Sequence, residues 1–177
     1  MATTNRSPAI ACIGVIGRHN NPLHISLFAA EGDSEPRDKL EFSFMLSTCL
    51  DLFEARMPSK TVGQDFGLLQ AIDERLAMYG WLTNTGVKFV IIVDMEGRSS
   101  NLQDNKNPAV LGLKNSDLTS TFQAIQIAYI RLLRNPFYTP DDHAPGKSSG
   151  STQITSRRFV QEIDRIGNAW APVIATR

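Results

Sequence analysis

The sequence predicts an α+β fold in which a five-stranded, mainly antiparallel sheet lies between two helical layers. Strand-like apolar segments come before and after a segment of helical period, and two further helical segments follow the last strand. The apolar runs at 10–16 and 87–94 are almost continuous, which is typical of strands that are covered on both faces. We therefore expect a three-layer sandwich, with one helix on one face of the sheet and two helices on the other.

Length and composition indicate a single globular domain over residues 1–177. Hydrophobic residues make up 42% and charged residues 20% of the chain, as in ordinary soluble domains. Eighteen basic residues balance eighteen acidic ones, which argues against a nucleic-acid partner held by overall basic charge. No apolar run approaches the roughly 18 residues of a transmembrane segment. Cys12 and Cys49 have apolar surroundings, and we interpret both as buried, reduced thiols of a cytosolic protein.

Two strands are expected first. The apolar run at 10–16 forms one of them, a cluster of turn-forming residues follows at 17–22, and 23–29 alternates as a half-buried strand does. The alternating residues expected to share one face are Leu23, Ile25 and Leu27. The polar segment at 31–38 contains glycine and proline and is expected to be a loop.

A helix is expected at 40–57, because apolar residues recur there at spacings of four, three and four. Pro58 is expected to end it. The residues of its apolar stripe are Phe42, Leu46, Cys49 and Phe53.

Three more strands are expected at 65–72, 75–83 and 87–94. Asn84-Thr85-Gly86 joins the last two and is typical of a hairpin, because Asn and Gly tolerate positive φ. The two most apolar strands, the first and the fifth, are expected at the centre with their hairpin partners beside them. The predicted strand order is therefore 2-1-5-4-3, counted along the chain.

A second helix is expected after a loop-like segment at 97–113. Asn115 or Ser116 is expected to cap its start, and it must end near Asn135 because Pro136 disfavours a helical residue before it. The residues of its apolar stripe are Leu118, Phe122, Ile125, Tyr129 and Leu132.

A last helix is expected after 141–150, a segment with the composition of a mobile loop. Thr155 or Ser156 is expected to cap this helix. Its apolar stripe comprises Phe159, Ile163, Ile166 and Trp170.

A buried strand that ends in Asp94, together with a Gly-Lys-Ser segment at 146–148, suggests a nucleotide-binding enzyme. The spacing argues against this function, because a phosphate-binding loop needs a glycine five residues before Gly146, where the sequence has Asp141. Such a loop also follows a strand, whereas this segment follows a helix. We therefore interpret Asp94 as a residue that ends its strand and makes a local turn hydrogen bond.

No catalytic residue, cofactor or metal ion is predicted. His19, His24 and His143 lie in a turn, a strand and a loop, without ligand spacing to one another or to the cysteines. We interpret all three as surface histidines.

The segment Asn135-Pro136-Phe137-Tyr138 allows two interpretations. It resembles the Asn-Pro-x-Tyr turn that some adaptor domains bind, which would leave it exposed as a peptide ligand. The favoured interpretation is structural, with the proline ending a helix and both aromatic side chains folded back onto the core.

Three segments, taken in order, resemble the sedlin family of TRAPP tethering-complex subunits. They are "IGVIGRHNNPLHI" at 13–25, "YGWLTNTGVKFVIIVD" at 79–94 and "NPFY" followed by Pro140, and "STCLDLFE" at 47–54 matches the family's Leu-Asp pattern. The Tyr-Gly-x-x-Thr-Asn hairpin is more similar to the sedlin-like paralogue than to sedlin. The chain departs from the family at 31–38, 97–113 and 141–155, which are expected to be loop insertions.

The resemblance implies a longin (SNARE-like) fold and a non-catalytic role. It implies a subunit of a complex that tethers transport vesicles and promotes nucleotide exchange on Rab GTPases, acting in the cytoplasm and peripherally at ER–Golgi and Golgi membranes. The expected direct partners are other TRAPP subunits. A longin domain of another trafficking system, such as an adaptor small chain or a SNARE regulator, is the first alternative, and a nucleotide-binding enzyme is the second.

Asp51 and Leu52 are the candidate residues for a partner interface. At 100° per residue, Asp51 lies about 160° from Phe53 of the buried stripe and so points away from the sheet. A carboxylate beside an apolar side chain suits protein recognition, whereas the geometry alone favours a plain solvated charge. The resemblance adds weight to an interface, because the family's first helix lies near neighbouring subunits.

Overall fold

The computed structural model describes residues 6–32, 37–57, 65–99, 113–146 and 152–172. The order of the elements is β1 (Arg6–Ile16), β2 (Pro22–Leu27), α1 (Lys39–Arg56), β3 (Asp65–Ala71), β4 (Leu76–Leu82), β5 (Lys88–Ser99), α2 (Asn115–Leu133), the short 3-10 helix η2 (Pro140–His143) and α3 (Arg157–Ala169). The five strands form one sheet in the order β2-β1-β5-β4-β3, and every neighbouring pair is antiparallel. The predicted α+β class, strand order and helix count per face are confirmed.

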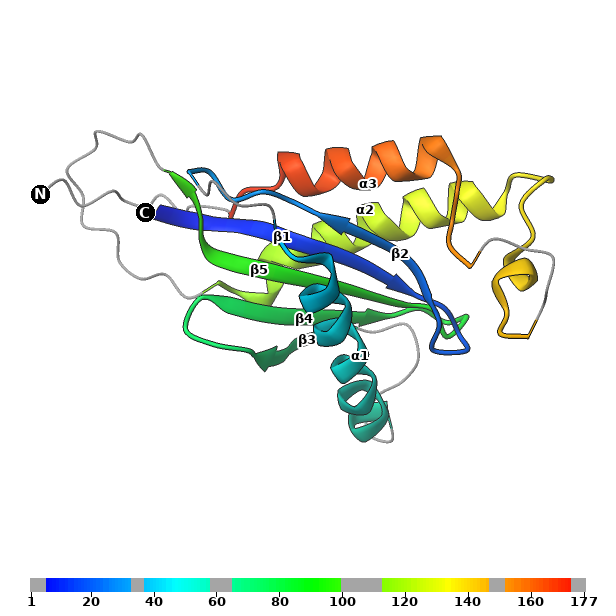
Figure 1. Cartoon of the computed structure of the whole chain (residues 1–177), viewed down its shortest axis with the longest axis horizontal. Helices are drawn as coiled ribbons and strands as arrows, with labels where there is room; N and C mark the ends of the chain where they lie inside the picture. Colours follow the sequence, from blue (N-terminus) through cyan, green and yellow to red (C-terminus); the bar gives the residue numbers. More distant parts are fainter. Residues whose placement is uncertain (1–5, 33–36, 58–64, 100–112, 147–151, 173–177) are drawn as a thin grey trace, which may run out of the picture.

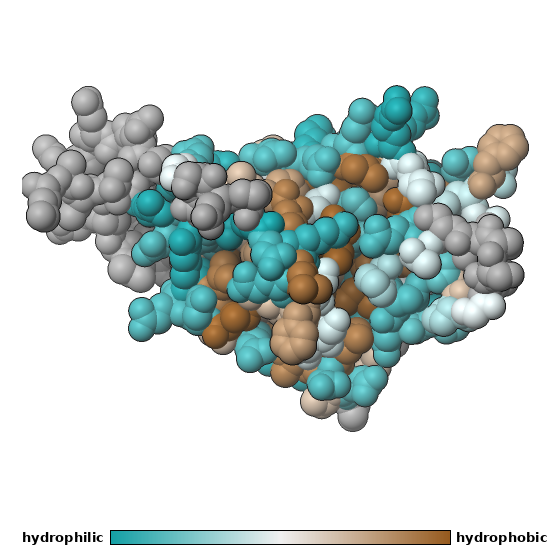
Figure 2. Space-filling view, viewed as in Figure 1, coloured by the Kyte–Doolittle hydropathy of each residue, from teal (hydrophilic) through white to brown (hydrophobic). Residues whose placement is uncertain are grey.

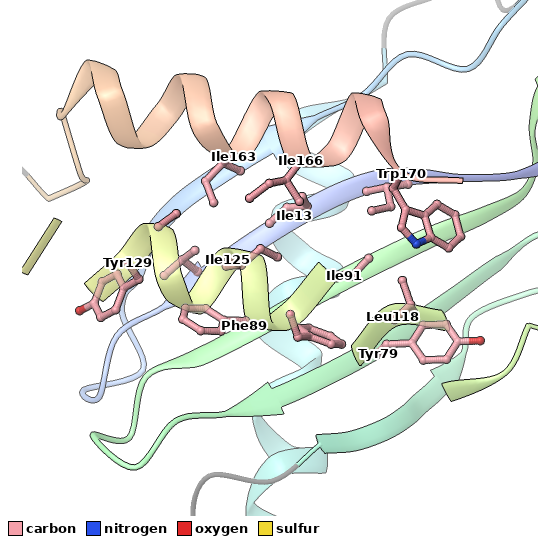
Figure 3. Packing of buried hydrophobic residues seen from close by; sticks show 14 of the residues in the cluster. Ile13, Tyr79, Phe89, Ile91, Leu118, Ile125, Tyr129, Ile163, Ile166 and Trp170 are labelled. Carbon is pink, nitrogen blue, oxygen red and sulfur yellow. The ribbon is translucent and has the colours of Figure 1, made fainter. Parts of the chain in front are cut away.

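The sheet separates two hydrophobic cores (Figure 1). Because side chains alternate along a strand, β5 sends Phe89, Ile91 and Val93 to one core, and Val90 and Ile92 to the other. The α1-side core contains the four residues of the predicted stripe of α1, and the α2–α3-side core contains the predicted stripes of α2 and α3. Figure 3 shows the side chains of α2 and α3 pointing toward the sheet. Burial on both faces explains why the central strands are almost continuously apolar.

The hairpin at 84–86 forms as predicted. Gly86 has φ +83°, and the N–H of Thr83 donates to the carbonyl of Val87 at 2.9 Å. The Thr83 hydroxyl also bonds the backbone of Val87, so this turn is closed from both sides.

The central strands are longer than predicted. β1 begins at Arg6 and β5 continues to Ser99, and these two residues pair with each other. The expected loop at 97–113 is therefore wrong at its start, while 100–112 lies outside the described residues. Polar residues extend the ladder here because strand pairing uses backbone groups, which need no apolar side chain.

β2 and η2 differ from expectation. A bulge shifts the register between Val15 and Ile16, which puts Leu23 in the α2–α3-side core, while Ile25 and Leu27 pack against the α1-side core. The predicted common face of these three residues is therefore wrong. Part of the expected mobile loop forms η2, whose Asp141 pairs with Arg18 at 2.7 Å.

The helix caps are partly as predicted. Ser156 is at the N-cap position of α3, as expected, but its side chain makes no capping hydrogen bond; Lys114 is the residue before α2, where Asn115 or Ser116 was expected. The Asp117 side chain accepts a hydrogen bond from the Lys114 N–H at 3.0 Å and so satisfies the backbone N–H of the residue that caps α2. Pro58, expected to end α1, lies outside the described residues.

Candidate partner-binding surface

The outward side of α1 carries two exposed apolar side chains and a carboxylate. Leu40 is 75% and Phe44 71% exposed, and Asp51 is exposed on the same side. At 100° per residue, these three residues lie about 150–170° from the centre of the buried stripe. We call Leu40, Phe44 and Asp51 the α1 outer face. Figure 2 shows apolar side chains gathered over α1 and the part of the sheet beside it.

The structure places the two predicted interface residues differently. Asp51 points to solvent, as expected, whereas Leu52 is half-buried and packs against the α1-side core. Sequence reasoning missed Leu40 and Phe44, although both are apolar and lie opposite the core stripe. Their spacing of four residues was the signal that could have found them.

The N-terminal end of α1 is held to the sheet by the two residues before it. Asp38 caps the helix and accepts a hydrogen bond from the Leu40 N–H at 2.9 Å. Arg37 donates to the carbonyl of Phe28 at 2.7 Å and to Asp94 at 2.6 Å. The start of the α1 outer face therefore has a defined position over the sheet.

Arg56 holds the other end of α1. Its guanidinium donates to the carbonyls of Leu68 at 2.7 Å and Leu69 at 2.9 Å on the edge strand β3. The side chain of Arg56 thus ties the last turn of α1 to the backbone of β3. Rigid presentation lowers the entropy that binding a partner costs.

Asp94 does not end its strand, and the earlier interpretation is wrong on this point. It lies inside β5 with a fully buried side chain. Arg75 donates to both of its oxygens, at 2.7 and 2.8 Å, and Arg37 donates to one of them at 2.6 Å. The expected local bond is also present, from the Glu96 N–H at 3.0 Å.

The negative charge of Asp94 is stabilised by Arg37 and Arg75. Burial raises the pKa of the carboxyl, but the hydrogen bonds from Arg75, Arg37 and the Glu96 N–H outweigh burial and hold the pKa below its ordinary value. Two arginines occupy both oxygens, so the carboxylate is unsuited to holding a magnesium ion.

His24 is buried, which contradicts its interpretation as a surface residue. Its Nε2 lies 2.8 Å from the Ser26 hydroxyl, which in turn donates to Asp164 at 2.8 Å. In a nucleophilic triad the histidine lies between serine and aspartate, whereas here the serine lies between the other two. Burial lowers the pKa of His24 and so favours its neutral form. The hydrogen bonds from His24 through Ser26 to Asp164 join β2 to α3.

The two cysteines are placed as predicted. Cys12 and Cys49 are buried as predicted, and burial raises the pKa of each to about 12, so both stay protonated. Among the described residues, no three His, Cys, Asp or Glu side chains gather closely enough to hold a metal ion. In the Gly-Lys-Ser segment at 146–148, Lys147 and Ser148 lie outside the described residues.

The two aromatic residues of the Asn135–Tyr138 segment differ in exposure. Phe137 is 94% exposed, so its predicted packing on the core is wrong, whereas Tyr138 packs against the α2–α3-side core as expected. Asn135 makes the turn: its side chain accepts from the Phe137 N–H at 3.1 Å and its carbonyl from the Tyr138 N–H at 3.0 Å. The turn sends neighbouring side chains in different directions.

Replacing Phe137 with alanine is expected to change the free energy of unfolding by less than about 0.5 kcal/mol, because an exposed side chain loses little packing. Tyr138→Ala is the matched variant, and it is expected to cost about 1–3 kcal/mol since it removes a ring that packs on the core. Urea unfolding of both proteins measures the difference. A larger loss for Phe137→Ala than for Tyr138→Ala would contradict these placements.

The sheet order, with one helix on one face and two on the other, defines the protein as a longin-like (SNARE-like) domain. The chain belongs to the Sedlin family, whose sequence model matches residues 15–169.

Two proteins that are similar to this chain carry the same name. The chain is 30% identical over 160 residues to the "Trafficking protein particle complex subunit 2-like protein" of Dictyostelium discoideum, which covers 89% of this chain and 95% of that protein. It is 31% identical over 151 residues to the protein of the same name from Rattus norvegicus, covering 82% of this chain and 94% of that protein. The expected likeness to the sedlin-like paralogue is thus confirmed.

Proposed function

We propose that this protein is a non-catalytic assembly subunit of a TRAPP-type vesicle tethering complex. The observation that carries the proposal is the α1 outer face, where Leu40 and Phe44 are exposed beside Asp51 on a helix held at both ends. Apolar contacts there would supply affinity and the carboxylate would set register, in an interface on the order of 1,600 Å² in total. The shared name of the relatives supports the kind of complex.

In this proposal the protein supports Rab nucleotide exchange only through the assembled complex. It works in the cytoplasm, peripherally at ER–Golgi and Golgi membranes, and its direct partners are other TRAPP subunits. None of the helices in the described residues is both long and apolar enough to cross a bilayer. The names of the relatives favour this reading over an adaptor small chain or a SNARE regulator.

Asp51→Tyr is expected to lower recovery of TRAPP subunits with the tagged protein by about tenfold or more, because a bulky ring replaces an exposed charge within the α1 outer face. The melting temperature is expected to stay within about 3 °C of wild type, since Asp51 makes no core contact. Quantitative mass spectrometry of the purified assemblies and thermal unfolding provide the two measurements.

The matched control is Gln161→Tyr, which puts the same side chain at an exposed position of α3 on the other face of the sheet. It is expected to leave recovery unchanged. Equal recovery with Asp51→Tyr and wild type would remove Asp51 from the interface. Recovery of coat or SNARE proteins in place of TRAPP subunits would overturn the proposed complex itself.

A further inference from the structure

We propose a second docking surface at the end of α2, which receives a protein partner that has an apolar pocket with an acidic rim. The observation behind it is Phe137, whose ring is 94% exposed although it lies in an ordered turn. The inference rests on the proposed function, because it gives an assembly subunit a second neighbour.

The turn holds Phe137 in one outward position. Asn135 accepts hydrogen bonds from the N–H groups of both Phe137 and Tyr138, and Pro136, between Asn135 and Phe137, has a fixed φ. On one side the turn continues from α2, and on the other Tyr138 is packed on the core and lies against the ring of His143, with ring centres 5.5 Å apart. A projecting aromatic with its backbone already ordered loses little entropy when it enters a pocket.

The last turns of α2, just before this ring in the chain, carry exposed apolar side chains. Ile127 is 51% and Ile130 40% exposed, and Leu133 is also exposed. At 100° per residue they occupy an arc of about 120°, which runs from the side opposite the buried stripe at Ile127 to the edge of that stripe at Leu133. We call Ile127, Ile130, Leu133 and Phe137 the α2-end patch.

The charge of the α2-end patch indicates the kind of partner. Arg134 is exposed on the same arc and Arg131 is exposed about 40° beyond its Ile127 edge, and residues 127–137 contain no acidic side chain. On α3, Glu162 pairs with Arg165 at 2.6 Å and also interacts electrostatically with Arg131, so Arg134 is the cation of this surface with no acid recorded beside it among the described residues. Two cations around an apolar centre are complementary to a pocket that carries carboxylates on its rim.

A lipid membrane and a second copy of the chain fit less well. Electrostatic membrane binding generally takes a cluster of four to eight basic residues, whereas this patch has two. A second copy would have to supply an acid-rimmed pocket. A cavity in the described residues borders the α2-end patch at Leu133, but it is lined by Arg18, His19 and His143, and its Asp141 pairs with Arg18.

The α2-end patch and the α1 outer face can be occupied together. α1 covers one face of the sheet and α2 the other (Figure 1), so the five strands separate the two surfaces. A subunit with this arrangement can join two neighbours that do not touch each other.

The test replaces Phe137 with the photo-crosslinking residue p-benzoylphenylalanine in the full chain, within a TRAPP assembly purified through a tag on another subunit. Irradiation is expected to crosslink position 137 to one other TRAPP subunit, and peptide mapping is expected to place the crosslink beside Asp or Glu residues. Phe137→Ala is expected to weaken binding of that purified subunit by about 30-fold or more. Phe44→Ala, which removes the same ring from the α1 outer face, is the matched control and is expected to change that affinity by less than about twofold.

A crosslink only to lipid, only to a second copy of the chain, or to no molecule would overturn the second surface. If Asp51→Tyr still lowers assembly in that case, the proposed function stands and only this inference fails. Absence of the wild-type chain from the purified assembly would overturn both.

Discussion

Asp94→Ala is expected to lower the free energy of unfolding by about 3–5 kcal/mol, the usual cost of removing one partner from a buried ion pair. The carboxylate is fully buried and accepts three hydrogen bonds from Arg37 and Arg75. Its removal leaves two guanidinium groups without a counter-charge at the junction of β5, the turn before β4 and the segment before α1. Urea unfolding at neutral pH measures the loss.

Asp94→Asn separates charge from shape in this experiment. The amide keeps the size of the side chain and an oxygen that can accept from the Glu96 N–H, but it cannot neutralise Arg37 and Arg75. We expect it to recover only a small part of the stability lost in Asp94→Ala. A loss below about 1 kcal/mol for both variants would mean that the ion pair is not a structural anchor.

The same carboxylate makes stability depend on acid pH. The pKa of Asp94 in the folded protein is held below its ordinary value of 3.8, so the folded state favours the ionised form. The contribution is fully present above the unfolded pKa and is lost as pH falls through the folded pKa. Between about pH 5 and 2, wild-type stability is expected to fall more steeply than that of Asp94→Asn, because the amide does not titrate.

Phe53→Ala is expected to cost about 3–5 kcal/mol, as for other fully buried aromatic side chains. The ring is fully buried in the α1-side core and lies 5.1 Å from the ring of Phe66, measured between centres. It also lies directly on Gly80 of β4, where a Cβ would be 2.6 Å from Phe53 Cζ. Removing it leaves a cavity between the helix and the sheet.

Phe44→Ala is the matched control, because it removes the same ring from the opposite side of the same helix. Phe44 is 71% exposed, and the expected change in unfolding free energy is below about 0.5 kcal/mol. Urea unfolding of the two variants tests which side of α1 faces the sheet. Equal losses for both would show that the helix is rotated from this position.

The periodic parts of the chain could be predicted from the sequence. The stripes of α1, α2 and α3 were found at 3.6-residue spacing, because a helix that packs on a sheet must repeat its apolar residues at that period. The strand order followed from the two most apolar runs, since only central strands are covered on both faces.

The candidate sites could not be predicted to the same extent. Asp51 was placed correctly in solvent because its angle on the helix is a local property. Phe137 and Tyr138 share one tetrapeptide, and no local pattern tells which of the two rings reaches the core. The burial of His24 was missed because it depends on a distant segment. His24 bonds Ser26 in the same strand, and Ser26 bonds Asp164, which comes from helix α3.

By itself the sequence determined the elements, their order in the sheet and the side of each helix that is buried. These properties depend on hydrophobic periodicity, which acts over a few neighbouring residues. Only the tertiary structure decided that Asp94 anchors two arginines, that Phe53 needs a glycine beneath it at position 80, and that Leu40, Phe44 and Phe137 stay uncovered. Each of these depends on which residues from distant segments meet in space, and a side chain's charge pairing or exposure is set by those neighbours rather than by its own position in the chain.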